Sequence, residues 1–218
     1  MQRENEPVAY PVAQYGDFTE KHVELYDNLM IRRLLEISSE YRKNTVLVDV
    51  GSGTASLLRQ MASYFPCVLI GLDFFPSIVE EAQKRINQAK LSSKIHIIRG
   101  DVHALPFPAN SVDFVISRST VHHWRNPVAA FREIFRVLSY RGFALIHDIR
   151  KDADPDALEH FNSQRALNDL PASKLDDKYT GEEIQEILHE AGIWEFSSIQ
   201  VPISGPYSLG YEVLIRKS

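Results

Sequence analysis

The stretch Thr45-Val46-Leu47-Val48-Asp49-Val50-Gly51-Ser52-Gly53-Thr54-Ala55 decides the fold. Its first six residues form a nearly continuous apolar run, which is typical of a parallel strand covered on both faces. The chain then turns through Gly51 and Gly53, and glycine lets a backbone approach a ligand closely because it has no Cβ. In open α/β sheets, ligands bind beyond the carboxyl ends of the strands, where the strand order reverses. The stretch therefore predicts a strand followed by a ligand-binding loop.

Strands and helices alternate on both sides of this loop. Apolar residues at three- and four-residue spacing predict a helix from Val23 to Ile37. After the loop, the expected elements are a helix over 57–65, a strand over 68–72, a helix over 78–86, strands over 95–98 and 112–116, a helix over 128–138 and a strand over 143–149. Five strands alternating with helices predict a parallel, doubly wound α/β sheet.

The alternation stops at Arg150, where a polar and charged segment begins. We interpret residues 151–178 as a cap or lid, and a solvated surface insertion remains the alternative. A helix over 181–191 follows, and Gly192 is a suitable residue to end it. The stretches 194–201 and 210–216 read as two strands whose connection is too short for a crossover helix, so we expect an antiparallel pair at the sheet edge. We expect one domain over 1–218, with an N-terminal helical region over 1–44.

Composition limits the classes of partner. The net charge of -5 and the pI near 5.9 argue against a surface built for phosphates, so nucleic acid is not an expected partner. Cys67 is the one cysteine, which excludes an intrachain disulfide and suits a reducing compartment. The first residues contain no apolar signal-peptide region, and no apolar run reaches membrane-spanning length. We therefore expect a soluble, cytoplasmic chain without a membrane span, as a monomer or homodimer.

The loop alone leaves its ligand open. The dinucleotide fingerprint needs a third glycine where this chain has Ser56, which weakens a pyrophosphate site. A purely structural tight turn also remains possible at this stage. Asp73 is expected at the end of the second strand, where a carboxylate can accept hydrogen bonds from both hydroxyls of a ribose. That feature favours a nucleoside-containing ligand, NAD among them.

Four motifs follow one another along successive strands: Val48-Asp49-Val50-Gly51-Ser52-Gly53, Gly71-Leu72-Asp73, Gly100-Asp101-Val102 and Val112-Asp113-Phe114-Val115-Ile116-Ser117. Their order and spacing resemble class I S-adenosylmethionine (SAM)-dependent methyltransferases. The stretches Val121-His122-His123-Trp124 and 131–138 are similar to the subgroup that contains the ubiquinone and menaquinone methyltransferases. The resemblance implies a Rossmann-like, mostly parallel seven-stranded sheet with an antiparallel C-terminal hairpin at its edge, and SAM as the methyl donor.

Carried over residue by residue, the resemblance implies specific contacts with SAM. The amino-acid end of SAM would be held by Asp49, Gly51, Ser52 and Gly53. Asp73 would bind the ribose. The adenine would lie among Phe74, Gly100, Asp101 and Val102, with Asp101 accepting from its amino group. The segment Ser117-Arg118 would pass beside the methionine part, and Tyr15 and Tyr26 would belong to a region folded over the cofactor.

The sequence says less about the methyl acceptor than about the methyl donor. Methyl transfer is an in-line displacement, so positioning can suffice, and a base is needed for a poorly ionised hydroxyl, an ammonium group or carbon. His122 and His147 are the candidate catalytic bases because both lie at predicted strand ends. The adjacent histidines 122 and 123 point differently and match no metal motif, so we expect no metal site.

The residues after the fourth strand bear on the acceptor class. They read Ser117-Arg118-Ser119-Thr120, whereas enzymes that methylate nucleobase or glutamine nitrogens usually carry an Asn/Asp-Pro-Pro-Tyr/Phe tetrad there. The resemblance therefore favours a small-molecule methyl acceptor. Two alternatives stay open: a SAM-binding protein without catalysis, and an NAD-dependent oxidoreductase.

Overall fold

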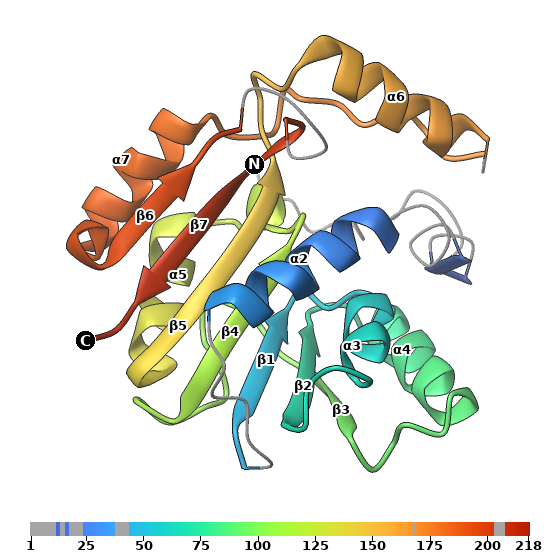
Figure 1. Ribbon diagram of the computed structural model, residues 1–218, viewed down its shortest axis with the longest axis vertical. Helices are drawn as coiled ribbons and strands as arrows, with labels where there is room; N and C mark the ends of the chain where they lie inside the picture. The colour runs from blue at the N-terminus through green and yellow to red at the C-terminus, as the bar shows by residue number, and fades with distance from the viewer. Residues whose placement is uncertain (1–11, 14–15, 18–23, 38–43, 168, 203–207) are drawn as a thin grey trace.

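The computed structural model describes residues 12–13, 16–17, 24–37, 44–167, 169–202 and 208–218 (Figure 1). The helices are α2 (Glu24–Ile37), α3 (Ser56–Met61), α4 (Pro76–Gln88), α5 (Pro127–Val137), α6 (Pro155–Ala166) and α7 (Gly181–Ala191), with 3₁₀ turns η1 (Val121–His123) and η2 (Trp194–Phe196). The strands are β1 (Val46–Val50), β2 (Val68–Asp73), β3 (Ile95–Arg99), β4 (Val112–Arg118), β5 (Leu138–Ile149), β6 (Ser197–Gln200) and β7 (Gly210–Arg216).

The seven strands form one sheet in the order β3-β2-β1-β4-β5-β7-β6. The pairs β1 to β2, β1 to β4, β2 to β3 and β4 to β5 are parallel, and β7 is antiparallel to both β5 and β6. This arrangement confirms the predicted α/β sheet with its antiparallel C-terminal hairpin. The strand order reverses between β1 and β4, which puts the expected ligand position at the carboxyl ends of these two strands.

Three predicted boundaries are wrong. The helix expected over 57–65 ends at Met61, and the strand expected over 143–149 begins at Leu138. The stretch 194–201 was expected to be extended throughout, but Trp194–Phe196 forms the 3₁₀ turn η2 and the strand begins at Ser197. The reason is local hydrogen bonding: the backbone N–H of Phe196 and the hydroxyl of Ser197 both donate to the carbonyl of Ile193, at 3.1 Å and 2.8 Å. These bonds keep the chain coiled for one more turn after α7.

Short-range signals explain where the helices begin and end. Asn126 precedes Pro127 and caps α5 by accepting a hydrogen bond from the N–H of Ala129 at 3.0 Å. Thr180 and Glu183 form a reciprocal capping box at the start of α7. That helix ends at Gly192, whose φ of 75° is the left-handed conformation that glycine adopts most easily.

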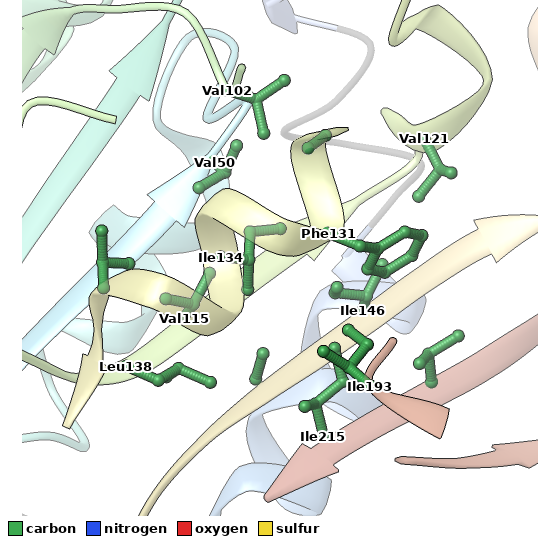
Figure 2. Close-up of a cluster of buried hydrophobic side chains, with 14 of the residues drawn as sticks. Val50, Val102, Val115, Val121, Phe131, Ile134, Leu138, Ile146, Ile193 and Ile215 are labelled. Atoms are coloured by element: carbon green, nitrogen blue, oxygen red, sulfur yellow. The ribbon is translucent and has the colours of Figure 1, made fainter. Parts of the chain in front are cut away.

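Two apolar clusters cover the two faces of the sheet. On one face α2, α3 and α4 pack over residues such as Leu47 and Ile116. On the other face α5 and α7 pack over the alternate residues of the same strands. Figure 2 shows this second cluster, where Phe131 and Ile134 of α5 lie near Val115 of β4 and Ile146 of β5. Because side chains alternate along a strand, each strand residue belongs to one of these two faces.

The segment 151–178 stands apart from both clusters. Its helix α6 begins at a cap in which Asp154 accepts from the N–H of Ala157 at 2.9 Å, and none of its residues is buried. Figure 1 shows α6 beyond the carboxyl ends of the strands, at the end of the sheet where the ligand is expected. Within the described ranges, no helix combines the length and the apolar character needed to cross a membrane.

Candidate functional site

The loop after β1 is held against β2 by its own backbone. The N–H groups of Gly51 and Ser52 both donate to the carbonyl of Leu72, at 2.8 Å and 3.0 Å. Gly51, Gly53 and Ala55 all have positive φ, at 76°, 55° and 63°. A left-handed conformation costs little for glycine and more for alanine, so the loop is a strained, tightly specified turn.

Gly51 is also a point of close contact with the segment after β4. An added Cβ at this position would lie 2.4 Å from Cγ2 of Thr120. The same segment is tied to β1, since the Ser117 hydroxyl donates to the carbonyl of Val50 at 2.7 Å and bonds to the Thr120 hydroxyl. The loop and the segment 117–120 therefore form one hydrogen-bonded, closely packed unit at the switch between β1 and β4.

Gly53, unlike Gly51, lies beside open space. An added Cβ there meets no atom of the described residues within 4 Å. Two hydroxyls of the same loop, those of Ser52 and Thr54, are buried without a hydrogen-bond partner among the described residues. Open space over a glycine beside unsatisfied hydroxyls is a cradle suited to a polar ligand.

Asp73 connects this cradle to the end of β2. Its carboxylate accepts from the N–H of Gly53 at 3.0 Å and from the N–H of Phe75 at 3.2 Å. Burial raises the pKa of Asp73 against the lowering effect of these N–H groups. Phe74 beside it is 48% exposed and meets Phe75 edge to face, so one ring at this strand end is open to a ligand.

Asp101 lies after β3 in a different environment. Its carboxylate accepts from the backbone N–H of His103 at 2.9 Å and from the guanidinium of Arg125 at 2.7 Å. Burial opposes ionisation, but the hydrogen bonds from His103 and the charge of Arg125 hold the pKa of Asp101 below its usual value. Gly100, just before Asp101, lies at a crowded position, since an added Cβ would be 2.6 Å from the side chain of Leu72. Val102, just after it, is buried in the core.

Three buried carboxyl groups and one guanidinium lie on the α2 face. Asp49 is the last residue but one of β1, Asp73 ends β2, and Asp27 projects from α2 with no exposed surface. Arg118 at the end of β4 pairs with Asp27 at 2.8 Å. Burial raises the pKa of Asp49 to about 7; Arg118 lowers it, and the charges of Asp27 and Asp73 raise it further. This part of the site has a surplus of negative charge and favours a cationic ligand.

Sequence reasoning did not find Asp27. The signal was present, since Asp27 occupies the same helical stripe as the buried Met30, Ile31 and Leu34. A carboxylate on an apolar stripe needs a buried partner, and Arg118, together with the side-chain amide of Gln60 at 2.8 Å, supplies it.

The two candidate bases lie on opposite faces of the sheet. His122 in η1 packs on the α5 and α7 side, where its Nδ1 lies 2.8 Å from a carboxylate oxygen of Asp148. His147 of β5 lies on the α2 side, where its Nε2 is 3.0 Å from Glu212 of β7. Glu212 also pairs with Arg33 of α2 at 3.0 Å. Although burial opposes it, these partners lower the pKa of Glu212.

We expect His147→Gln to affect stability more than catalysis. The change removes the partner of Glu212, whose charge Arg33 still neutralises, so we expect a loss of about 1 kcal/mol of unfolding free energy. The methylation rate at saturating SAM should stay within about twofold, because we expect the hydrogen bond between His147 and Glu212 to have no contact with the methyl acceptor. Urea denaturation and a rate measurement check both, with the exposed His96→Gln as control. A rate loss above tenfold with SAM binding intact would instead make His147 the base.

Two predicted contacts cannot be placed. Tyr15 and the side chain of Tyr26 lie outside the described residues. The other sequence-predicted residues gather at the carboxyl ends of β1 to β4, namely Asp49, Gly51, Ser52, Gly53, Asp73, Phe74, Gly100, Asp101, Val102, Ser117 and Arg118. His122 and His147 flank this group on the two sides of the sheet.

The sheet order, the glycine loop and the aspartate at the end of β2 define the class of the domain. In these features the domain is similar to class I SAM-dependent methyltransferases, which use SAM as their cofactor. Residues 48–146 match the model of the family described as a methyltransferase domain.

Known proteins support the same class. The uncharacterised methyltransferase YcgJ of Bacillus subtilis is 30% identical over 132 residues, which cover 61% of this chain and 51% of that protein. This chain thus spans about half of that relative's length. A SAM-dependent methyltransferase from Aquifex aeolicus shares the fold with a TM-score of 0.68 at 17% identity, over 94% of this chain and 98% of that one.

A second solved structure was determined with the cofactor bound. Phosphoethanolamine N-methyltransferase 2 of Haemonchus contortus, in complex with SAM, has a TM-score of 0.59 at 21% identity. The similarity covers 78% of this chain and 38% of that one. At this identity, as for the Aquifex aeolicus protein, the likeness shows the fold alone.

Proposed function

We propose that this chain transfers the methyl group of SAM to a small-molecule acceptor and releases S-adenosylhomocysteine. The observation that carries the proposal is the group of Asp27, Asp49 and Asp73 around Arg118, beside the glycine loop. The sulfonium and ammonium groups of SAM are cationic and complement these carboxylates. The pyrophosphate of NAD is anionic and would be repelled by them, which counts against a dinucleotide at this site.

The proposed contacts follow the geometry of the loop. Asp49 and the turn Gly51-Ser52-Gly53 would hold the amino-acid end of SAM, and Asp73 the ribose. Phe74 offers its exposed ring to the adenine, bordered by Gly100, Asp101 and Val102. The segment Ser117-Arg118 would line the methionine part. When bound, SAM supplies an electrophilic methyl group, and the residues of the chain position it and exclude water.

The acceptor is proposed from the rest of the chain. The net charge of -5 does not favour a nucleic-acid substrate, and 117–120 lacks the tetrad used for planar nitrogen acceptors. The residues 121–124 and 131–138 support a place near the ubiquinone and menaquinone methyltransferases. We propose that 151–178 forms a cap over the acceptor, because α6 lies beyond the strand ends and buries none of its residues.

Calorimetry with SAM, S-adenosylhomocysteine and NAD tests the proposed cofactor site. We expect binding of the two sulfur ligands and none of NAD, and the reverse result would overturn the proposal. Incubation of SAM with a panel of metabolites should then yield S-adenosylhomocysteine. SAM binding without turnover across the panel would indicate a binding protein without catalysis.

A further inference from the structure

A histidine and an aspartate form a buried pair on the α5 and α7 face. His122 is 7% exposed and Asp148 is 4% exposed. The Nδ1 atom of His122 lies 2.8 Å and 3.0 Å from the two carboxylate oxygens of Asp148. The pair is separate from the carboxylates around Arg118, which lie on the α2 face.

The carboxylate of Asp148 is fixed by the backbone on both of its oxygens. The N–H of Ile149 donates to Oδ1 at 2.7 Å, and the N–H of His122 donates to Oδ2 at 3.2 Å. A carboxylate held in this way accepts hydrogen bonds, so Nδ1 of His122 carries the hydrogen of the neutral ring. The basic lone pair is then on Nε2, and Asp148 stabilises the imidazolium that forms when Nε2 takes a proton.

The segment that leads into η1 contacts the glycine loop. Thr120, whose methyl group sits against Gly51, is the residue just before η1, and Ser117 is bonded to the carbonyl of Val50. His122 therefore follows directly on the unit that fixes the glycine loop. A base held by this unit has a fixed position relative to the ligand of the glycine loop.

A third polar side chain, that of Tyr211, lies beside Asp148. Tyr211 of β7 is opposite Asp148 in the β5–β7 ladder and is 3% exposed. Among the described residues, its hydroxyl has no hydrogen-bond partner. A buried hydroxyl left unpaired is unfavourable, so this group is suited to hydrogen-bond a ligand oxygen.

We propose that His122 is the general base of the methyl transfer, that Asp148 is its positioning residue, and that the acceptor is a weakly acidic hydroxyl, as in a phenol or an enol. This inference rests on the proposed function. The acceptor oxygen forms a bond to the methyl carbon while the carbon–sulfur bond breaks and leaves its electron pair on sulfur. The hydroxyl proton passes to Nε2 of His122 and then to solvent.

The chemistry of the pair favours a hydroxyl over a carboxylate or a neutral amine as the acceptor. A carboxylate has no proton to lose, and an amine can lose its proton to water after the transfer. A phenol ionises near pH 10, within a few units of an imidazole, so a positioned histidine can remove its proton during the transfer. A buried, oriented base is therefore most useful to this class of acceptor.

The test uses the full chain, two variants and a matched control. Wild type, His122→Gln, Asp148→Asn and the exposed His96→Gln are assayed with phenols and enols, each paired with the corresponding aromatic amine and carboxylic acid. We expect hydroxyl methylation, a kcat loss of about 10² to 10⁴-fold for His122→Gln and about 10 to 100-fold for Asp148→Asn. SAM affinity should stay near wild type in variants that melt cooperatively, which separates a lost base from a lost fold.

Two further readouts isolate the role of Asp148. The kcat of the wild type and of Asp148→Asn is measured as a function of pH, and a positioning role for Asp148 requires the two profiles to differ. The charged or titratable groups beside His122 are Asp148, His123 and Asp177, and Tyr211 lies opposite Asp148 in the β5–β7 ladder. Nitrogen-15 NMR should show the Nδ1–H tautomer of His122 in the wild type.

Each outcome bears on one proposal. If SAM fails to bind, the proposed function is wrong. If SAM binds and amines or carboxylates are methylated while no hydroxyl is, or no acceptor of the panel reacts, the inference is wrong and the cofactor site stands. A kcat within threefold of wild type for His122→Gln, or an Nε2–H tautomer, likewise overturns the inference.

Discussion

Asp49→Asn is expected to stabilise the ligand-free protein while it weakens SAM binding. The carboxyl group of Asp49 is 3% exposed, and burial, together with its neighbours Asp27 and Asp73, raises its pKa from 3.8 to about 7. Above pH 7 the folded protein therefore holds a buried charge that is unfavourable. An amide of the same shape removes it, and we expect a gain of about 2 to 4 kcal/mol in unfolding free energy at pH 8.

The raised pKa of Asp49 determines how the stability of the wild type changes with pH. A folded-state pKa above the unfolded value means that the folded protein binds more protons between pH 4 and 7. The contribution of Asp49 is therefore fully present below about pH 4 and is lost as pH rises to about 7, so wild-type stability should fall over this window. Urea denaturation of wild type and Asp49→Asn from pH 4.5 to 8 should show the fall in the first and a flatter profile in the second.

Binding should respond in the opposite direction. A cationic ligand favours the ionised carboxylate, so SAM should release a proton when it binds near pH 6.5, detected by calorimetry in buffers of different ionisation enthalpy. Asp49→Asn should release none and bind SAM about tenfold or more weakly. The exposed Asp176→Asn serves as control and should change neither quantity. A variant that is less stable than wild type and binds SAM normally would contradict the assignment of Asp49.

The fold could be predicted because its strands are buried on both faces. The expected strand over 68–72 is observed as β2 (Val68–Asp73), and the expected 112–116 as β4 (Val112–Arg118). Continuous apolar runs that end in Gly or Asp mark such strands clearly. The turn Trp194–Phe196 could not be predicted, because the bonds that coil it converge on the backbone carbonyl of Ile193, which no side-chain pattern reveals.

The site was predicted less completely, for a physical reason. Residues that follow a strand can be placed at the sheet edge from sequence, as Asp73 and Ser117 were. Ion pairs depend on which side chains meet in space, and Arg33 and Glu212 are 179 positions apart. His122 and His147 lie on opposite faces of the sheet. The face of His147 follows from the alternation of side chains along β5, which the sequence predicts. The face of His122 depends on the turn η1, which only the structure shows.

Gly51→Ala is expected to have the largest effect on SAM binding. The residue has φ of 76°, and the added Cβ would lie 2.4 Å from Cγ2 of Thr120. The left-handed conformation costs an alanine about 1 to 2 kcal/mol, and the clash adds about 1 to 3 kcal/mol because Thr120 is held by Ser117. Since the loop must move to relieve the clash, we expect SAM affinity to fall about 100-fold or more.

Gly192→Ala is the matched control, because Gly192 has nearly the same φ, 75°, at the end of α7, and an added Cβ there meets nothing described within 4 Å. It should lose about 1 kcal/mol of stability from backbone strain and bind SAM like wild type. In Gly51→Ala/Thr120→Ser the clashing methyl group is gone and the hydroxyl that bonds to Ser117 remains, so part of the affinity should return. If Gly51→Ala binds SAM as well as Gly192→Ala does, or the double variant regains nothing, the contact between the loop and Thr120 does not shape the cofactor site. Thermal melting and calorimetry on the four proteins separate strain, which both glycine variants share, from the steric contact, which only Gly51 has.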